Sequence, residues 1–306
     1  MDIPVDASAA KDRDSWLALI DLIGKEEGHF HTIGTRHWAM LIEDSQTLIV
    51  SFETIDQARA RPGQMPLAHH IAAAKGWSHL CIIADGQTWY RDPAVYAYFD
   101  QMVDQSFFEG FDRILFYGAG PSSHAAVAYS VCAPGAQVLV LNPVATLDPT
   151  QAIWDDRFKS SRKLDFTSRY GYAPDMADGC AHLSMIFDPQ IKADAMHAAL
   201  FRATHATSLL ARHGGAELEC ILSRMGILSD VVILAAEGNL SADSFAKLWR
   251  NRRNDAGYLK ELLHDLEATG KKARVFALCS NVARRLNIRG FRKRLAAFNE
   301  SPRPTV

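Results

Sequence analysis

The 306-residue sequence predicts an α/β protein with a mostly parallel, doubly wound sheet and a helical C-terminal appendage. Two observations support this fold class. Short apolar runs alternate with segments of helical spacing between residues 65 and 237, and such alternation requires parallel strands joined by right-handed crossovers. Beyond Asn239 the pattern becomes purely helical and the charge changes sign, since residues 241–306 carry a net +9 and residues 1–240 a net −11.

Composition narrows the class of protein further. Hydrophobic residues make up 48% of the chain, which is enough for a substantial core. The N-terminal stretch MDIPVDASAAKDRD is acidic and polar, and no apolar run could cross a bilayer, so we expect a cytoplasmic protein with no membrane partner. The cysteines are isolated and never form C-x-x-C, which predicts buried thiols rather than disulfides or a zinc site. They are Cys81, Cys132, Cys180, Cys220 and Cys279.

The N-terminal region is predicted to begin with a helix. Apolar residues recur at helical spacing over residues 12–25, and a glycine-containing loop follows, so residues 1–36 form a predicted helix and loop. Two apolar runs at 38–43 and 47–52 are separated by three polar residues. This arrangement predicts an antiparallel hairpin.

Residues 37–238 are predicted to form the α/β domain. Its further strands are predicted at 79–85, 113–117, 137–141, 182–187 and 206–211. Its helices are predicted at 65–75, 93–103, 191–201, 216–225 and 229–237. The irregular stretch 144–180 predicts an insertion over the sheet edge, and residues 239–306 predict a basic helical region.

The stretch DRILFYGAGPSSHAAVAY, residues 112–129, passes from an apolar run through a glycine-rich corner into a helical pattern. It predicts the strand-turn-helix junction on which α/β proteins place reactive groups. With the order of the other elements, it resembles the α/β-hydrolase superfamily over roughly residues 37–235, in particular bacterial members whose elbow reads F-Y-G-x-S-M-G-G-Y-A-A. Phe116-Tyr117-Gly118-Ala119 and Ala125-Ala126 match that motif, and Gly120 stands in place of the nucleophilic serine.

The resemblance implies a triad in the order nucleophile, acid and base, with Asp188 and His213 at the positions of the acid and the base. Each follows a predicted strand, where loop side chains of α/β folds converge. The second oxyanion donor would come from the loop around Glu53 and Thr54. Asp188 before a proline also fits a helix cap, and His213 beside two glycines also fits an ordinary loop residue.

The glycine-rich corner allows two registers. In one, Gly120 holds the nucleophile position without a side chain, and Pro121 has no N–H for the oxyanion hole, so the protein would be an inactive hydrolase. In the other, Ser122 is the nucleophile and Ser123 supplies the N–H. His124 then stands where the elbow requires a small residue.

Two functions are therefore open. One is a serine esterase or acyl hydrolase acting on a small ester or acylated sugar, with Ser122 as nucleophile, His213 as base and Asp188 as its orienting acid. The alternative is a catalytically inactive pseudo-hydrolase that binds a ligand or a partner. The basic segment 241–300 would then contact an anionic or protein partner, or be a solvated surface that balances the acidic domain.

No cofactor or metal is expected. The corner half-matches the dinucleotide motif G-x-G-x-x-G, but Ser123 replaces the third glycine and the next strand ends at Asn142 rather than at an acidic residue. The histidines before residue 40 and the pair His69-His70 lack the spacing of metal ligands. Nucleic acid is not expected as a partner, because no recognised nucleic-acid motif accompanies the basic segment.

Overall fold

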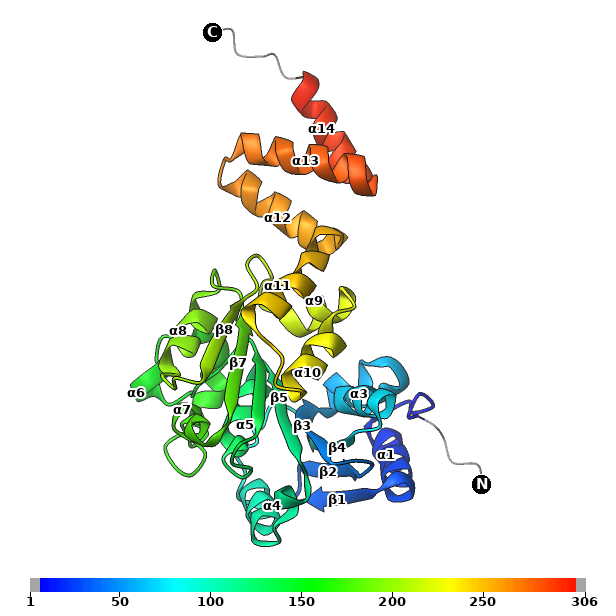
Figure 1. The fold of residues 1–306 in the computed structure, drawn as a ribbon, viewed down its shortest axis with the longest axis vertical. Helices are drawn as coiled ribbons and strands as arrows, with labels where there is room; N and C mark the ends of the chain where they lie inside the picture. Colours follow the sequence, from blue (N-terminus) through cyan, green and yellow to red (C-terminus); the bar gives the residue numbers. More distant parts are fainter. Residues whose placement is uncertain (1–5, 301–306) are drawn as a thin grey trace.

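A computed structural model describes residues 6–300, with side chains to residue 298. Its centre is an eight-stranded sheet in the order β1-β2-β4-β3-β5-β6-β7-β8 (Figure 1). The strands are β1 (His29–Ile33), β2 (His37–Ile42), β3 (Thr47–Thr54), β4 (Ser78–Ala84), β5 (Arg113–Ala119), β6 (Gln137–Leu141), β7 (His182–Phe187) and β8 (Ala206–Leu210). The pairs β1–β2 and β2–β4 are antiparallel and the other five are parallel, which confirms the predicted fold class.

Helices cover both faces of the sheet. In the body they are α1 (Arg13–Glu27), α2 (Ile55–Arg59), α3 (Leu67–Lys75), α4 (Pro93–Asp104), α5 (Pro121–Ser130), α8 (Lys192–Leu200), α9 (Leu218–Arg224) and α10 (Leu228–Ala236), with 3-10 turns η1 (Pro62–Gln64) and η2 (Phe107–Gly110). On β3, Leu48 and Val50 share a core with α4 and α5, whereas Ile49 shares the opposite core with α3 and α10. Because both faces are buried, the central strands are continuous apolar runs.

Two predictions about the N-terminal region are wrong. Residues 29–33, predicted as a loop, form β1, whose mostly exposed polar side chains conceal its pairing with β2. The hairpin between 38–43 and 47–52 does not form, because β4 lies between the two runs and pairs with both β2 and β3. The Asp44 N–H donates to the Ser78 hydroxyl at 2.8 Å, which holds the connection across the start of β4.

The C-terminal region is helical, as the sequence predicts, and residues 144–180, expected to form an insertion, lie between β6 and β7. Between β6 and β7 the chain forms only short helices, which are α6 (Pro149–Ala152), η3 (Asp156–Lys163), α7 (Ala173–Met176) and η4 (Ala177–Gly179). The C-terminal helices are α11 (Ala242–Trp249), η5 (Arg250–Arg253), α12 (Ala256–Ala268), α13 (Lys272–Leu286) and α14 (Arg289–Glu300). Figure 1 shows α12, α13 and α14 extending one after another away from the sheet.

Within residues 6–300, none of the helices combines the length and the hydrophobicity that a bilayer-spanning segment requires.

Candidate functional site

The sharp turn after β5 is the feature around which the candidate site is built. β5 runs to Ala119, two residues beyond its predicted end, and Gly120 then turns the chain into α5 with φ 55° and ψ −123°. Strand and helix approach so closely that a Cβ atom on Gly118 would lie 2.2 Å from the carbonyl oxygen of Ser122. A strand-to-helix turn of this kind has the geometry of a nucleophile elbow, and Gly120 is the residue at the turn.

The place of this elbow in the sheet decides the fold. Two antiparallel pairs lie at one edge, five parallel pairs follow, and the elbow comes after β5 in the middle of the sheet. The chain has the α/β-hydrolase fold. In this fold the nucleophile elbow follows the central strand, and in this chain Gly120 stands at that turn.

Comparisons with known proteins give likenesses of fold only. No family model and no curated protein matches the sequence. The Glycosylation Associate Protein (Gap123) complex from Streptococcus agalactiae matches with a TM-score of 0.45 and 14% identity, over 70% of this chain and 47% of that chain, so the match spans about half of the streptococcal chain. An esterase domain from Rhodothermus marinus matches with a TM-score of 0.43 and 14% identity, over 69% of this chain and 96% of that chain. An S-formylglutathione hydrolase from Agrobacterium tumefaciens matches with a TM-score of 0.44 and 12% identity, over 68% of this chain and 93% of that chain.

The residues after Gly120 are already engaged in holding the elbow. Ser122 is buried in the first turn of α5, and its Oγ lies 3.4 Å from the hydroxyl of Tyr90. The N–H of Ser123, which was predicted to serve the oxyanion hole, donates to the carbonyl of Gly120 at 2.9 Å. The Ser123 hydroxyl also donates to that carbonyl, at 2.6 Å, and accepts the N–H of Val144 at 2.9 Å.

The predicted acid and base lie in neighbouring loops, with no hydrogen bond between them among the described residues. Asp188 is buried, and its carboxylate accepts the N–H groups of Gln190 and Gly215, both at 3.0 Å. His213 is half-buried, and its Nδ1 lies 3.1 Å from the carboxylate of Asp265 in α12. Asp188 therefore holds the backbone of the loop that contains His213, while the imidazole faces the appendage.

The predicted oxyanion loop is also occupied by local contacts. The N–H of Thr54 donates to the side chain of Gln57, as part of the capping box that begins α2. The buried carboxylate of Glu53 accepts Nε of Arg61 at 2.8 Å and the N–H of Leu67 at 2.7 Å. Burial raises the pKa of Glu53, and the attraction of the Arg61 guanidinium opposes that rise.

After β8 the chain returns across the carboxyl ends of the parallel strands, and we call residues 211–219 the return segment. At the end of β7, the carboxylate of Asp188 accepts the N–H of Gly215 in this segment. At the end of β6, the amide oxygen of Asn142 accepts the N–H of Leu218 at 3.2 Å. The hydroxyl of Tyr117 on β5 donates to Glu219 at 2.5 Å. Ligands of open α/β sheets bind along this edge, and here the protein's own polar groups are paired across it.

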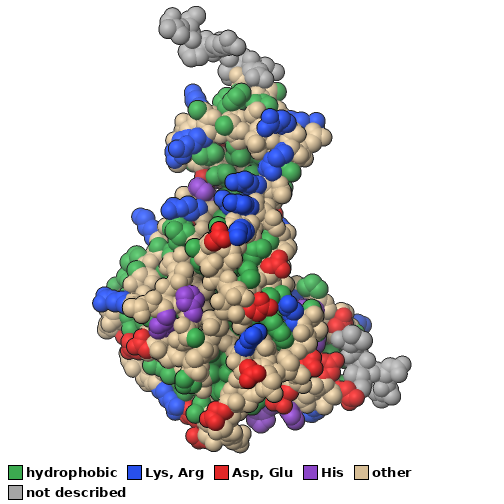
Figure 2. Space-filling model, viewed as in Figure 1, with side chains coloured by type: hydrophobic (Ala, Val, Ile, Leu, Met, Phe, Trp, Pro, Cys, Tyr) green, Lys and Arg blue, Asp and Glu red, His purple; other side chains and the backbone are tan. Residues whose placement is uncertain are grey.

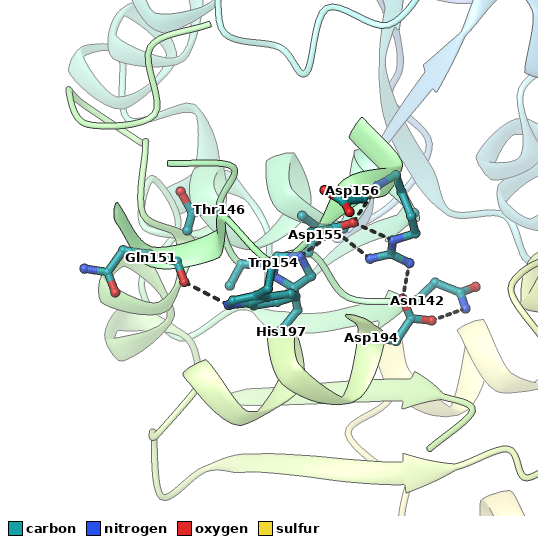
Figure 3. Close-up of polar contacts among 12 residues, drawn as sticks. Asn142, Thr146, Gln151, Trp154, Asp155, Asp156, Asp194 and His197 are labelled. Carbon is teal, nitrogen blue, oxygen red and sulfur yellow. Dashed lines mark hydrogen bonds and ion pairs between the residues drawn. The ribbon is translucent and has the colours of Figure 1, made fainter. Parts of the chain in front are cut away.

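A buried network fixes the insertion above α8 (Figure 3). Arg157 donates to Asp155 and to Asp194, at 2.8 and 2.6 Å, and both carboxylates are fully buried. Asp194 also accepts the amide of Asn142 at 2.8 Å, and Asp155 lies 2.9 Å from Nε2 of the buried His197. The network therefore joins the end of β6, the insertion and α8.

The hydrogen bonds of this network determine its protonation. The N–H of Ala145 donates to Nδ1 of His197, so the ring proton is on Nε2, which donates to Asp155. Burial alone would raise the pKa of Asp155, but hydrogen bonds from His197 and Arg157 outweigh that effect and hold its pKa well below the ordinary value. Because both ring nitrogens are engaged, His197 has no free position for general base chemistry.

Sequence reasoning missed this network and also a second one, in which Arg61 donates to the carboxylates of Glu53 and Glu219. Arg61 and Glu219 are 158 positions apart, and no local pattern links them. Asp194 and His197 had a usable signal, because two polar residues three positions apart lie on the buried side of a short helix. Among the described residues, no three His, Cys, Asp or Glu side chains gather where they could bind a metal.

Four surface cavities, with volumes of about 390 to 610 Å³, lie away from the elbow. None of the four is lined by Gly120, Ser122 or His213.

Replacement of Gly118 by alanine tests the close approach at the elbow. The new Cβ would overlap the backbone of α5, so we expect Gly118→Ala to lower the free energy of unfolding by about 3 kcal/mol or more. Urea unfolding measures the loss. The matched control is Gly110→Ala, where no atom lies within 4 Å of the new Cβ and a change within about 0.5 kcal/mol is expected. Equal stabilities of the two variants would contradict the described turn.

Proposed function

We propose that this chain is a hydrolase-fold binding protein that has no serine nucleophile and acts by holding a partner. One observation carries the proposal, which is the elbow backbone of Gly120. The residue that occupies the nucleophile position has no side chain, and the next residue, Pro121, has no N–H. Loss of one oxyanion donor alone lowers kcat by about 10²- to 10³-fold, and here the attacking group is absent as well.

The contacts of the alternative nucleophile support the same conclusion. Ser122 lies inside the first turn of α5 and is buried beside Tyr90. No hydrogen bond among the described residues joins it to a histidine, whereas a serine nucleophile requires an adjacent base. His213 is paired with Asp265 of the appendage. For the chain to act as a serine esterase on a small ester or acylated sugar, several of these paired groups would therefore have to rearrange.

The helical appendage supports partner binding. It projects from the body, so its surface is reachable from several sides (Figure 1). Lys and Arg side chains gather where α12 leaves the body and along the appendage, as Figure 2 shows on one face. We propose this basic region as the contact surface for an anionic protein partner in the cytoplasm, with electrostatic attraction accelerating the encounter.

A fluorophosphonate probe tests the absence of a nucleophile, because it labels serines that an adjacent base activates. We expect no labelling of the folded parent chain, and none of Ser122→Ala or His213→Ala, under conditions that fully label an active serine esterase. Labelling of the parent that disappears in both variants would instead establish the triad of Ser122, His213 and Asp188 and reject the proposal.

A further inference from the structure

The last strand of the sheet has an unpaired edge. β8 pairs only with β7 among the described residues. The N–H of Ala211 donates to the carbonyl of Phe187, at the end of β7. Along a parallel strand, the N–H and C=O groups of successive residues point alternately toward one neighbouring strand and away from it. The N–H and C=O groups of Ser208 and Leu210 therefore point away from β7, toward solvent. Such an edge is a template for another extended segment.

A groove runs along this edge. It has a volume of about 430 Å³ and lies between β8 and the helical segment formed by α11 and η5. Leu209 is buried in its floor together with Phe245 and Trp249 of α11. Leu210 on the same strand is 40% exposed, so its side chain can contact a bound segment. The groove thus offers both backbone hydrogen bonds and apolar contact.

Three arginines form the far wall of this groove, and we call Arg250, Arg252 and Arg253 the groove arginines. Within the described residues, none of them has a carboxylate at ion-pair distance. Arg252 is held in place, since it donates to the carbonyl of Trp249 at 2.6 Å and lies over the indole ring. The nearby acid Asp243 is already paired with Lys247 at 2.7 Å. The positive charge of the wall is therefore available to a partner.

From these observations we infer that the groove binds an extended acidic peptide segment of a partner protein, which adds to the sheet as a ninth strand beside β8. The inference rests on the proposed function and names the class of partner. The backbone of Ser208 and Leu210 exchanges hydrogen bonds with the peptide, as in other strand-addition complexes. Carboxylates of the peptide pair with Arg250 and Arg253, and an apolar side chain covers Leu210.

Charge favours this occupant over others. The groove arginines belong to the region 241–306 with its net charge of +9, so a segment rich in Asp or Glu gains attraction that a neutral one lacks. Hydrogen bonds to a strand edge also require a backbone with its own N–H groups. A nucleic acid supplies the negative charge but no such backbone, which separates the two kinds of partner experimentally.

The test uses the full chain and a fluorescent peptide in which Glu alternates with Val over about eight residues, a common strand length. Binding is followed by fluorescence anisotropy at low salt. The control peptide has the same charge but carries proline in place of alternate valines, so it lacks ladder donors. We expect the control to bind at least about tenfold more weakly. Equal binding of the two peptides, or of a single-stranded oligonucleotide of the same charge, would overturn the inference.

Variants of the protein test the two contacts separately. Ser208→Pro removes one outward N–H at an edge position that tolerates proline, and Arg250→Glu with Arg253→Glu reverses the wall charge. We expect each change to weaken binding of the peptide by about tenfold or more, while Arg292→Glu on α14 leaves binding unchanged. Thermal unfolding verifies that each variant is folded. Unchanged binding in folded Ser208→Pro, or sedimentation that shows a second copy of the chain on this edge, would reject the peptide as occupant.

Fluorophosphonate labelling of the same preparations keeps the two proposals apart. Labelled protein that still binds the peptide would reject the missing nucleophile and leave the groove in place. Unlabelled protein that fails to bind the peptide would reject the groove alone.

Discussion

Acidification from pH 6.5 to pH 4 is expected to lower the free energy of unfolding steeply, because three histidines are buried and a fourth, His69, is half-buried, all as neutral rings. Burial lowers the pKa of His37 and His69 to about 4, and that of His79 and His124 to about 3. Below pH 6.5 the unfolded chain binds protons at these positions and the folded chain does not. The stability that they contribute is present above pH 6.5 and is lost as the pH falls toward these lowered pKa values.

The expected slope is about 1.4 kcal/mol per pH unit for each such histidine. Urea unfolding at several pH values within this interval measures it. His79→Leu is the informative variant, because both nitrogens of this buried ring lack a hydrogen-bond partner among the described residues. We expect the slope of the variant to be smaller than that of the parent by about 1.4 kcal/mol per pH unit, the contribution of one histidine. The control His29→Leu removes an exposed ring from β1 and should keep the slope of the parent. A His79→Leu slope equal to the parent's would contradict the burial of the neutral ring.

The second large effect is expected from the insertion network. Arg157→Met leaves the carboxylates of Asp155 and Asp194 buried without their cation. Removal of one partner from a buried ion pair costs about 3 to 5 kcal/mol, and we expect a loss of unfolding free energy in that range. Urea unfolding measures the loss, and limited proteolysis reports whether the insertion is the part that loosens.

An exposed ion pair in the same insertion is the control. Lys159 pairs with Asp156 at 3.0 Å, and both side chains are largely exposed, so Lys159→Met should change stability by less than about 1 kcal/mol. The double variant Arg157→Met with Asp194→Asn should recover part of the loss, because it removes one of the two uncompensated charges. Similar losses in Arg157→Met and Lys159→Met would mean that the buried network is not formed.

The parallel half of the sheet was predictable because each of its strands carries its own signal. The apolar run of β6 is bounded by glycine and by Asn142, and its predicted limits, 137–141, coincide with those of the structure. The antiparallel edge was not predictable in the same way. Two neighbouring apolar runs look like a hairpin, and nothing in residues 38–52 indicates that β4, which comes later in the chain, separates them.

The strand-to-helix turn after β5 was located from the sequence, but the residue at its corner was not. GAGPSS fits a nucleophile at Gly120 or at Ser122, and only the backbone angles of Gly120 place the turn. The pairing of Arg61 with Glu219 was beyond sequence reasoning for another reason. The two residues are brought together by the return segment, so their pairing follows from the fold instead of predicting it.

The change of charge near residue 240 suggested a boundary between two units, yet the hydrophobic interior does not stop there. A single apolar cluster runs from Leu115 in the sheet through Trp249 to Phe291 in the last helix. Tyr258 also donates to the carbonyl of Arg212 at 3.2 Å, which ties α12 of the appendage to the loop beyond β8. Sheet and appendage thus share one continuous apolar interior, and a truncation designed at the charge boundary would cut through it.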